Sequence, residues 1–189
     1  AFIGAILSLI SLGQPLLIKT GVVFSAVSLI LLMPQKIEAL TAIRYLKSGI
    51  FRFGASDYSG AILDFTKAIE IDPSNADTYL KRGLAKNDAK DYSGAIADYT
   101  KAIEINPNFG DAYNNIANVK NKLGHYSEAI SYITKAIEID PNDSIAYFTR
   151  GISKNKLEDY SGAISDYTKA IEINPNLKDA YNNIGRIKH

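Results

Sequence analysis

The sequence contains no cysteine and no tryptophan, and only one methionine, among its 189 residues. The absence of cysteine excludes disulfide frameworks, thiolate nucleophiles and cysteine-based zinc or iron–sulfur sites. An excess of one charge is also lacking, because 21 basic and 20 acidic residues leave a formal net charge of +1. A surface that mixes both signs gives no long-range attraction to phosphate backbones, so we expect no nucleic acid partner.

Charge is almost absent from the first 33 positions, where Lys19 is the only charged residue. Residues 15–33 approach the roughly 20 apolar residues that a helix needs to cross a hydrocarbon core. A second uncharged run precedes them. We therefore predict a membrane anchor over residues 1–33, made of one hydrophobic helix or of two that form a truncated hairpin, followed by a connection over 34–41. A signal peptide and a buried helix that caps the first repeat are the alternatives; the first is disfavoured because no small-residue cleavage site follows Leu31.

Basic residues predominate directly after this run. This stretch contains four basic residues and a single acidic one, Glu38; the basic residues are Lys36, Arg44, Lys47 and Arg52. Since positive charge beside a membrane span stays on the cytoplasmic side, the sequence predicts a membrane-anchored protein whose remaining residues lie on the cytoplasmic, or stroma-like, side. We also expect a fragment of a longer protein, because the sequence starts at an alanine and stops inside a predicted helix.

The rest of the chain repeats every 34 residues. A segment of the type Asp-Tyr-Ser-Gly-Ala-Ile recurs in register with a proline that follows it, at Asp57, Asp91, His125 and Asp159 and at Pro73, Pro107, Pro141 and Pro175. Apolar residues within each unit are spaced three and four apart, which is typical of amphipathic helices. Aspartate is a favourable N-cap and proline ends a helix, so each unit is predicted to hold two helices. The predicted fold class is all-α.

The conserved spacing inside the units resembles the tetratricopeptide repeat family. In one unit, Tyr79 is followed by Gly83, Ala95, Tyr99 and a proline in the family's order. The resemblance covers about residues 42–189 and implies a right-handed superhelix of helix-turn-helix repeats. The four units would be 42–75, 76–109, 110–143 and 144–177, with the first helix of a truncated fifth at 178–189. It further implies that the first helix of each unit lines a concave groove that binds other proteins.

Several positions give expectations about packing. Small residues on the first helices, such as Gly83, are predicted to meet alanines on the second helices, such as Ala95. Arg82 and Arg150 stand where the family usually has leucine, so we expect their alkyl stems to cover apolar surface while each guanidinium reaches water. Aspartates three residues before a lysine, as in Asp98 with Lys101, are predicted to form weak ion pairs on one helix face. The second and fourth units share Arg-Gly, at Arg82 and Arg150, whereas the third and fifth share Asp-Ala-Tyr-Asn-Asn-Ile, from Asp111 and Asp179. This alternation suggests duplication of a 68-residue unit, with chance as the alternative.

Amide side chains are frequent on the predicted groove side. The candidate partner-binding residues are Lys81, Asn114, Asn115, Asn118, Asn121, Asn182, Asn183 and Arg186. An amide donates and accepts hydrogen bonds at once, so a row of them can hold the backbone of an extended peptide. Asn115 and Asn183 match the asparagine ladder in the repeat domain of O-linked N-acetylglucosamine transferases, which implies the same mode. The alternative is that these amides are solvated and were copied by duplication.

The first repeat differs from the others on this side. Its groove positions are apolar, at Ile43, Leu46, Ile50 and Phe53. They are predicted to be covered by the N-terminal segment, or else to dock an apolar partner. The basic residues with which co-chaperone repeats clamp a C-terminal carboxylate are also missing, since Leu80, Asn114 and Phe148 stand where the leading lysine is expected. Chaperone tails are therefore not expected partners.

No catalytic or metal site is predicted. Glutamates such as Glu70 recur at one outward position of each unit, and His125 and His189 lack a second ligand at metal spacing. We therefore predict no enzyme, no cofactor and no small-molecule substrate. The expected function is a membrane-tethered adaptor or assembly factor that binds a peptide or helix of another protein in its groove. The alternatives are the regulatory region of a larger, for example glycosyltransferase-like, enzyme and a self-associating array.

Overall fold

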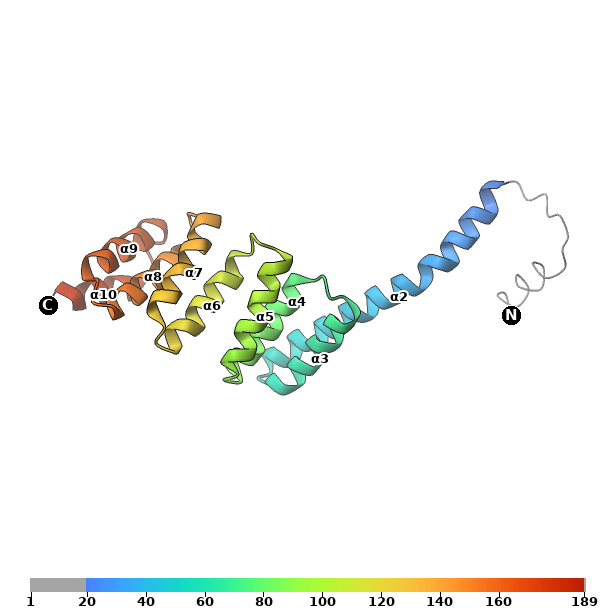
Figure 1. The fold of residues 1–189 in the computed structure, drawn as a ribbon, viewed down its shortest axis with the longest axis horizontal. Helices are drawn as coiled ribbons and strands as arrows, with labels where there is room; N and C mark the ends of the chain where they lie inside the picture. The colour runs from blue at the N-terminus through green and yellow to red at the C-terminus, as the bar shows by residue number, and fades with distance from the viewer. Residues whose placement is uncertain (1–19, 189) are drawn as a thin grey trace. The chain divides into compact units, whose positions relative to one another are not determined.

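The computed structural model describes residues 20–188, with side chains from residue 35 onward, and this part of the chain contains helices and no strand. The helices are α2 (Thr20–Gly54), α3 (Tyr58–Ile71), α4 (Ala76–Asp88), α5 (Tyr92–Ile105), α6 (Gly110–Lys122), α7 (Tyr126–Ile139), α8 (Ser144–Lys156), α9 (Tyr160–Ile173) and α10 (Lys178–Lys188) (Figure 1). The chain divides into two units, residues 1–40 and 41–189. The all-α prediction is confirmed for the described residues.

The N-terminal prediction requires a correction. No helix in the described part of the chain is long and apolar enough to cross a membrane. The described apolar run, residues 20–33, is shorter than a membrane span requires, and α2 continues from it without a break through the charged Lys36 and Glu38. The predicted membrane-anchored localisation with a cytoplasmic array is therefore wrong. Residues 1–19, which carry the rest of the predicted hydrophobic helices, lie outside the described residues.

The second helices begin and end where the sequence predicts. The carboxylates of Asp57, Asp91 and Asp159 accept a hydrogen bond of 2.9 Å from the backbone N–H three residues later. This bond lowers the pKa of Asp159, since it stabilises the charged form. These three N-caps are confirmed, whereas His125 starts α7 without a side-chain cap. Each of these helices ends two residues before its proline, because the residue before a proline is driven to an extended conformation.

Each second helix contributes one fully buried alanine and one large buried side chain to the core. The fully buried alanines are Ala61, Ala95, Ala129 and Ala163, and the large side chains are Phe65, Tyr99, Ile133 and Tyr167. Glycines on the facing first helices make room for the rings rather than for the alanines: a Cβ added to Gly83 would lie 2.5 Å from Tyr99. The nearest side chain to Gly83 on the facing helix is therefore the Tyr99 ring, a contact that was not predicted from the sequence.

Buried ion pairs join the two helices of a repeat. The buried carboxylate of Asp98 on α5 accepts from Arg82 Nε at 2.9 Å and Nη2 at 2.6 Å, and Lys86 Nζ lies 2.7 Å away. Arg150 and Lys154 surround Asp166 in the same way. The expectation that these guanidinium groups reach water is wrong, because a carboxylate on the facing helix lies within bidentate reach.

The predicted pairing of these aspartates along their own helix is also wrong. Lys101 and Lys169 instead bind the glutamates three residues further on, Glu104 at 2.9 Å and Glu172 at 3.1 Å. The aspartates face the first helix and the lysines face solvent, so the two lie on different sides of the helix. Because both partners are exposed to solvent, these pairs contribute little to stability.

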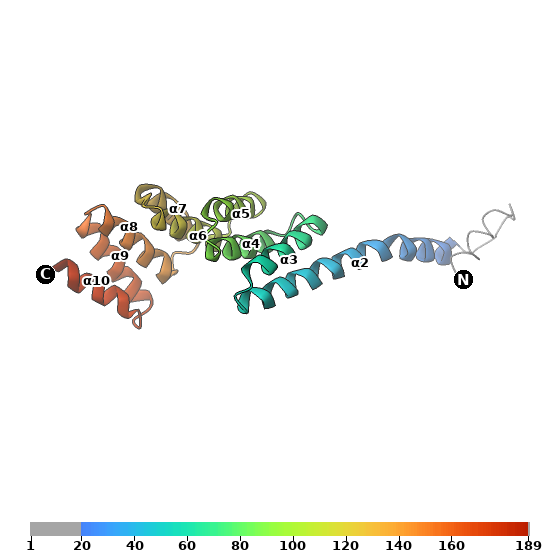
Figure 2. The same ribbon diagram turned by 90° about the horizontal axis from the view of Figure 1, so that it is seen from below.

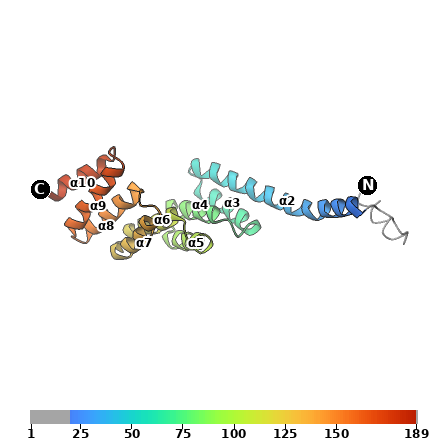
Figure 3. The ribbon, with the colours of Figure 1, turned by 90° about the horizontal axis from the view of Figure 1, so that it is seen from above.

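The first helices form the inner side of the array. Besides the contacts within and between neighbouring helices, α4 packs on α6 and α6 on α8, whereas no pair of second helices in the described chain packs as closely. Closer spacing on one side of a stack places that side on the inside of its curvature. Figures 2 and 3 show the helix pairs of the second unit following one another in chain order. We call the side formed by α4, α6, α8, α10 and the end of α2 the inner face.

Candidate protein-binding surface

Three of the predicted binding residues are exposed on the inner face. Asn118, Asn182 and Arg186 are exposed to solvent. Their side chains form no hydrogen bond and no ion pair with the described residues. They sit on α6 and α10, which pack against the second helices α7 and α9. Rigid elements that present free donors and acceptors are suited to bind a polar backbone.

Three other predicted residues have partners within the protein. Asn114 donates to Asp143 at 2.6 Å, Asn121 accepts from Ser153 at 2.8 Å, and Asn115 donates to a backbone carbonyl of its own helix at 2.8 Å. Asp143 caps α8 and Ser153 lies within it. The first two amides therefore tie α6 to α8, and they support the inner face rather than leaving their full hydrogen-bonding capacity to a ligand.

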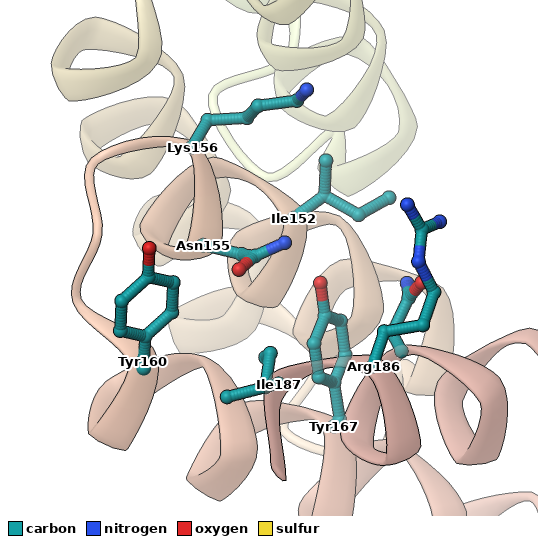
Figure 4. A pocket seen from close by; sticks show the side chains of 8 residues that line it. Ile152, Asn155, Lys156, Tyr160, Tyr167, Arg186 and Ile187 are labelled. Carbon is teal, nitrogen blue, oxygen red and sulfur yellow. The ribbon is translucent and has the colours of Figure 1, made fainter. Parts of the chain in front are cut away.

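The remaining two, Lys81 and Asn183, line two separate pockets on the inner face. The apolar pocket, of 110 Å³, is lined by Ile50, Phe53, Phe65, Lys81 and Leu84. The polar pocket, of 660 Å³, is lined by Ile152, Asn155, Lys156, Tyr160, Tyr167, Asn183, Arg186 and Ile187 (Figure 4). The structure thus brings Asn183 and Arg186 together in one pocket and places Lys81 in the other.

The two pockets occupy the same place in the repeat. Each of the five residues of the apolar pocket has a counterpart 102 residues later, three repeats along, in the polar pocket. Ile50 is matched by Ile152, but Phe53 is replaced by Asn155 and Leu84 by Arg186. The same position between successive first helices is therefore apolar near the start of the array and rich in amides and cations near its end.

The polar pocket has an unpaired hydroxyl at its base. Tyr167 is fully buried, and its hydroxyl, with the Asn183 amide beside it, makes no well-formed hydrogen bond to a described residue. Burial raises the pKa of Tyr167 to about 12, against a smaller lowering by the adjacent Asn183 amide. The phenol therefore stays protonated at neutral pH and can donate. Figure 4 shows its hydroxyl and the Asn155 amide pointing into the pocket, with Arg186 at the rim.

Several pocket residues were not predicted as binding residues from the sequence. They are Ile152, Asn155, Lys156, Tyr160, Tyr167 and Ile187. The repeat register carries a signal for Asn155, because Asn87 and Asn121 precede it at the same position of earlier units. Of the apolar residues of the first repeat, Ile43 and Ile50 are 46% and 45% exposed. The segment predicted to cover them, residues 1–33, lies outside the residues whose side chains the structure describes.

The described residues contain no group of three histidine or acidic side chains that could hold a metal ion. The ion pairs in the inner layer hold helices together, and none of their carboxylates lines either pocket. The chemistry available on the inner face is therefore hydrogen bonding by amides, charge from Arg186 and Lys156, and apolar contact. This combination can hold a polypeptide.

Comparisons with known proteins agree with this geometry. The family model described as "Tetratricopeptide repeat" matches residues 76–109, 110–143 and 144–177, and one described as "TPR repeat" matches residues 55–88. No curated protein sequence matches the chain. The family matches together cover more than half of the sequence.

Solved structures of similar fold include proteins described as peptide-binding. A crystal structure of MamA shares 26% identity at a TM-score of 0.71, covering 78% of this chain and 80% of that one. YrrB, described as a TPR protein with an unusual peptide-binding site, shares 26% at 0.65, covering 77% and 75%. The first TPR of Spaghetti (RPAP3), bound to an HSP90 peptide, shares 26% at 0.59, covering 60% and 90%.

Proposed function

The chain belongs to the tetratricopeptide repeat family and is a protein-interaction scaffold, and from this premise we propose that it holds an extended segment of a partner protein along its inner face. The observation that carries the proposal is the row of free polar side chains there. Asn118, Asn182 and Arg186 are exposed, and no described residue satisfies them. Amides so placed can meet a backbone N–H and C=O at the same time.

The supporting residues explain why this row is positioned before a partner arrives. Asn114 and Asn121 fix α6 against α8 through bonds of 2.6 and 2.8 Å, and Lys122 on α6 donates to Asn87 on α4 at 3.0 Å. Successive first helices are thus joined by amide hydrogen bonds. A preorganised surface loses less conformational entropy on binding, so more of the interaction energy appears as affinity.

The partner is an extended segment rather than a compact ligand. The two pockets lie three repeats apart, and exposed amides occupy the helices between and beside them. One small molecule could not contact all of these residues, whereas a peptide whose side chains alternate in direction could use several. Each contact would be modest, and affinity would come from their number.

Replacing Asn118 and Asn182 together by alanine is expected to weaken peptide binding by about tenfold or more, since each net hydrogen bond contributes about 0.5–1.5 kcal/mol. The probe is a fluorescent peptide selected from a random dodecapeptide library on the unmodified protein, and the measurement is fluorescence anisotropy. The exposed Asn176, in the loop before α10, provides the matched control as Asn176→Ala.

The control should bind the peptide as the unmodified protein does. The double variant should also keep the thermal unfolding midpoint of the unmodified protein, because both amides are exposed. Equal affinity of the double variant and the unmodified protein for every selected peptide would rule out the inner-face proposal.

A further inference from the structure

We propose that the polar pocket binds an acidic side chain of the partner segment, while the apolar pocket three repeats earlier binds an apolar one. This inference rests on the proposed function, because it assigns chemistry to two places along the same inner face. It means that the bound segment carries an apolar residue toward the α2–α4 end of the array and a carboxylate toward the α8–α10 end.

The charges of the polar pocket require a partner. Arg186 and Lys156 line it, no acidic residue does, and the described residues provide no ion pair for either. Three other arginines of the array have carboxylate partners: Arg52 lies 3.1 Å from Asp64, Arg82 2.6 Å from Asp98 and Arg150 2.8 Å from Asp166. Two unpaired cations facing one pocket attract an anion, and the planar guanidinium fits a carboxylate in bidentate fashion.

A second, independent feature points to an acceptor in the ligand. The Tyr167 hydroxyl is buried, unpaired and directed into the pocket (Figure 4). Leaving a buried hydroxyl without a hydrogen bond is unfavourable, so an acceptor on the ligand would stabilise the complex. Asn155 and Asn183 add amide donors at the same place. A carboxylate has about four lone-pair sites, so it can accept from Arg186, from an amide and from the phenol together.

The apolar pocket supplies the contrast. It holds no tyrosine hydroxyl and no arginine, and its one polar side chain, Lys81, lies 3.4 Å from Asp77. That cation is therefore already partly neutralised. Phe53 and Leu84 offer apolar surface where the polar pocket has Asn155 and Arg186. A charged ligand group would lose its hydration there without a partner, whereas an apolar side chain would gain by burial.

The test is selection of the same random dodecapeptide library on the unmodified protein and on three variants. Arg186→Glu reverses the charge of the polar pocket, Ile50→Glu places a charge in the apolar pocket, and Lys178→Gln removes a charge from α10 outside both pockets. Arg186, Ile50 and Lys178 are exposed, so all three variants should fold, which circular dichroism checks. Inorganic phosphate and acetate at equal ionic strength are the competitors.

Acidic residues should be enriched at one peptide position on the unmodified protein and on Lys178→Gln. On Arg186→Glu that position should change to lysine or arginine, while Ile50→Glu should lose an apolar preference at a different position and keep the acidic one. In a selected peptide, changing the enriched glutamate to glutamine should weaken binding by about tenfold on the unmodified protein and by less than about twofold on the Arg186 variant.

The outcomes separate the two proposals. If selected peptides depend on Asn118 and Asn182 but show no acidic preference, the assignment of the polar pocket is wrong and the proposed function stands. If phosphate displaces the peptides and acetate does not, the pocket is a phosphate site, and the carboxylate assignment is again wrong. If no selected peptide depends on the inner face, the proposed function itself fails.

Discussion

Asp98→Ala is expected to lower the free energy of unfolding by about 3–5 kcal/mol, because it leaves two partly buried cations without their buried carboxylate. Arg82 Nη2 lies 2.6 Å and Lys86 Nζ 2.7 Å from this side chain, which is 5% exposed. Arg82 also reaches Thr66 on α3 at 3.1 Å, so the loss should weaken the contact between consecutive repeats as well. Urea unfolding followed by circular dichroism measures the change.

The matched control is Asp88→Ala, since Asp88 is exposed at the end of α4 and exposed substitutions of this kind usually change stability by less than about 0.5 kcal/mol. Equal unfolding midpoints for Asp98→Ala and the unmodified protein would contradict the role given to the buried ion pair.

The third repeat shows how the array can dispense with this ion pair. Ile116 replaces the arginine and Tyr132 the aspartate, and both pack into the core. Lys120, the equivalent of Lys86, is paired instead with Glu128 at 2.7 Å. The hydrogen bond from Lys120 is the largest cause of the lowered pKa of Glu128. The residues at these positions therefore change together between repeats: the second repeat has the ion pair of Arg82 and Asp98, and the third has the apolar pair of Ile116 and Tyr132.

This exchange offers a rescue of the first variant. Arg82→Ile, Asp91→His, Gly94→Glu and Asp98→Tyr together transplant the third repeat's set into the second. Asp91 must change with Gly94, because a Cβ at Gly94 would run into the Asp91 carboxylate. The fourfold variant is expected to recover most of the stability lost in Asp98→Ala, since apolar replacements of buried ion pairs are often neutral.

Gly83→Ala is expected to lower the free energy of unfolding by about 1–3 kcal/mol through overpacking, although alanine is the better helix former by about 1 kcal/mol. The added methyl would lie 2.5 Å from the Tyr99 ring, which is fully buried and has no room to move. Thermal unfolding of the variant tests this.

The third repeat again supplies the compensating change. Ala117 stands at the glycine position there and Ile133 at the aromatic one, and both are fully buried. Tyr99→Ile added to Gly83→Ala should therefore lose less stability than the sum of the two single changes, as a double-mutant cycle reveals. Simple additivity would show that the ring does not set the size of its neighbour.

The sequence predicted the repeat framework well because periodicity records local structure. The N-cap at Asp91 and the helix end before Pro107 depend on residues close together in the chain. The ion pair of Arg82 with Asp98 was missed for the opposite reason. Its members lie on facing helices, and spacing along one helix relates Asp98 only to neighbours such as Lys101.

The N-terminal run and the site show the same limit. Hydropathy identified residues 15–33 as apolar, but the described helix α2 carries that run onward into charged residues as one helix. On the inner face, the register placed Asn118 and Asn121 together, yet only the structure shows that Asn121 is already bound to Ser153. Residue type indicates what a side chain can bind, and the neighbouring helices decide whether it is free.

Amide hydrogen exchange with and without a selected peptide tests the central claim most directly. If the inner face holds the partner segment, bound peptide should slow exchange in the first helices α4, α6, α8 and α10 and leave the second helices α3, α5, α7 and α9 largely unchanged. Slowed exchange confined to the second helices, with the first helices unaffected, would contradict the account.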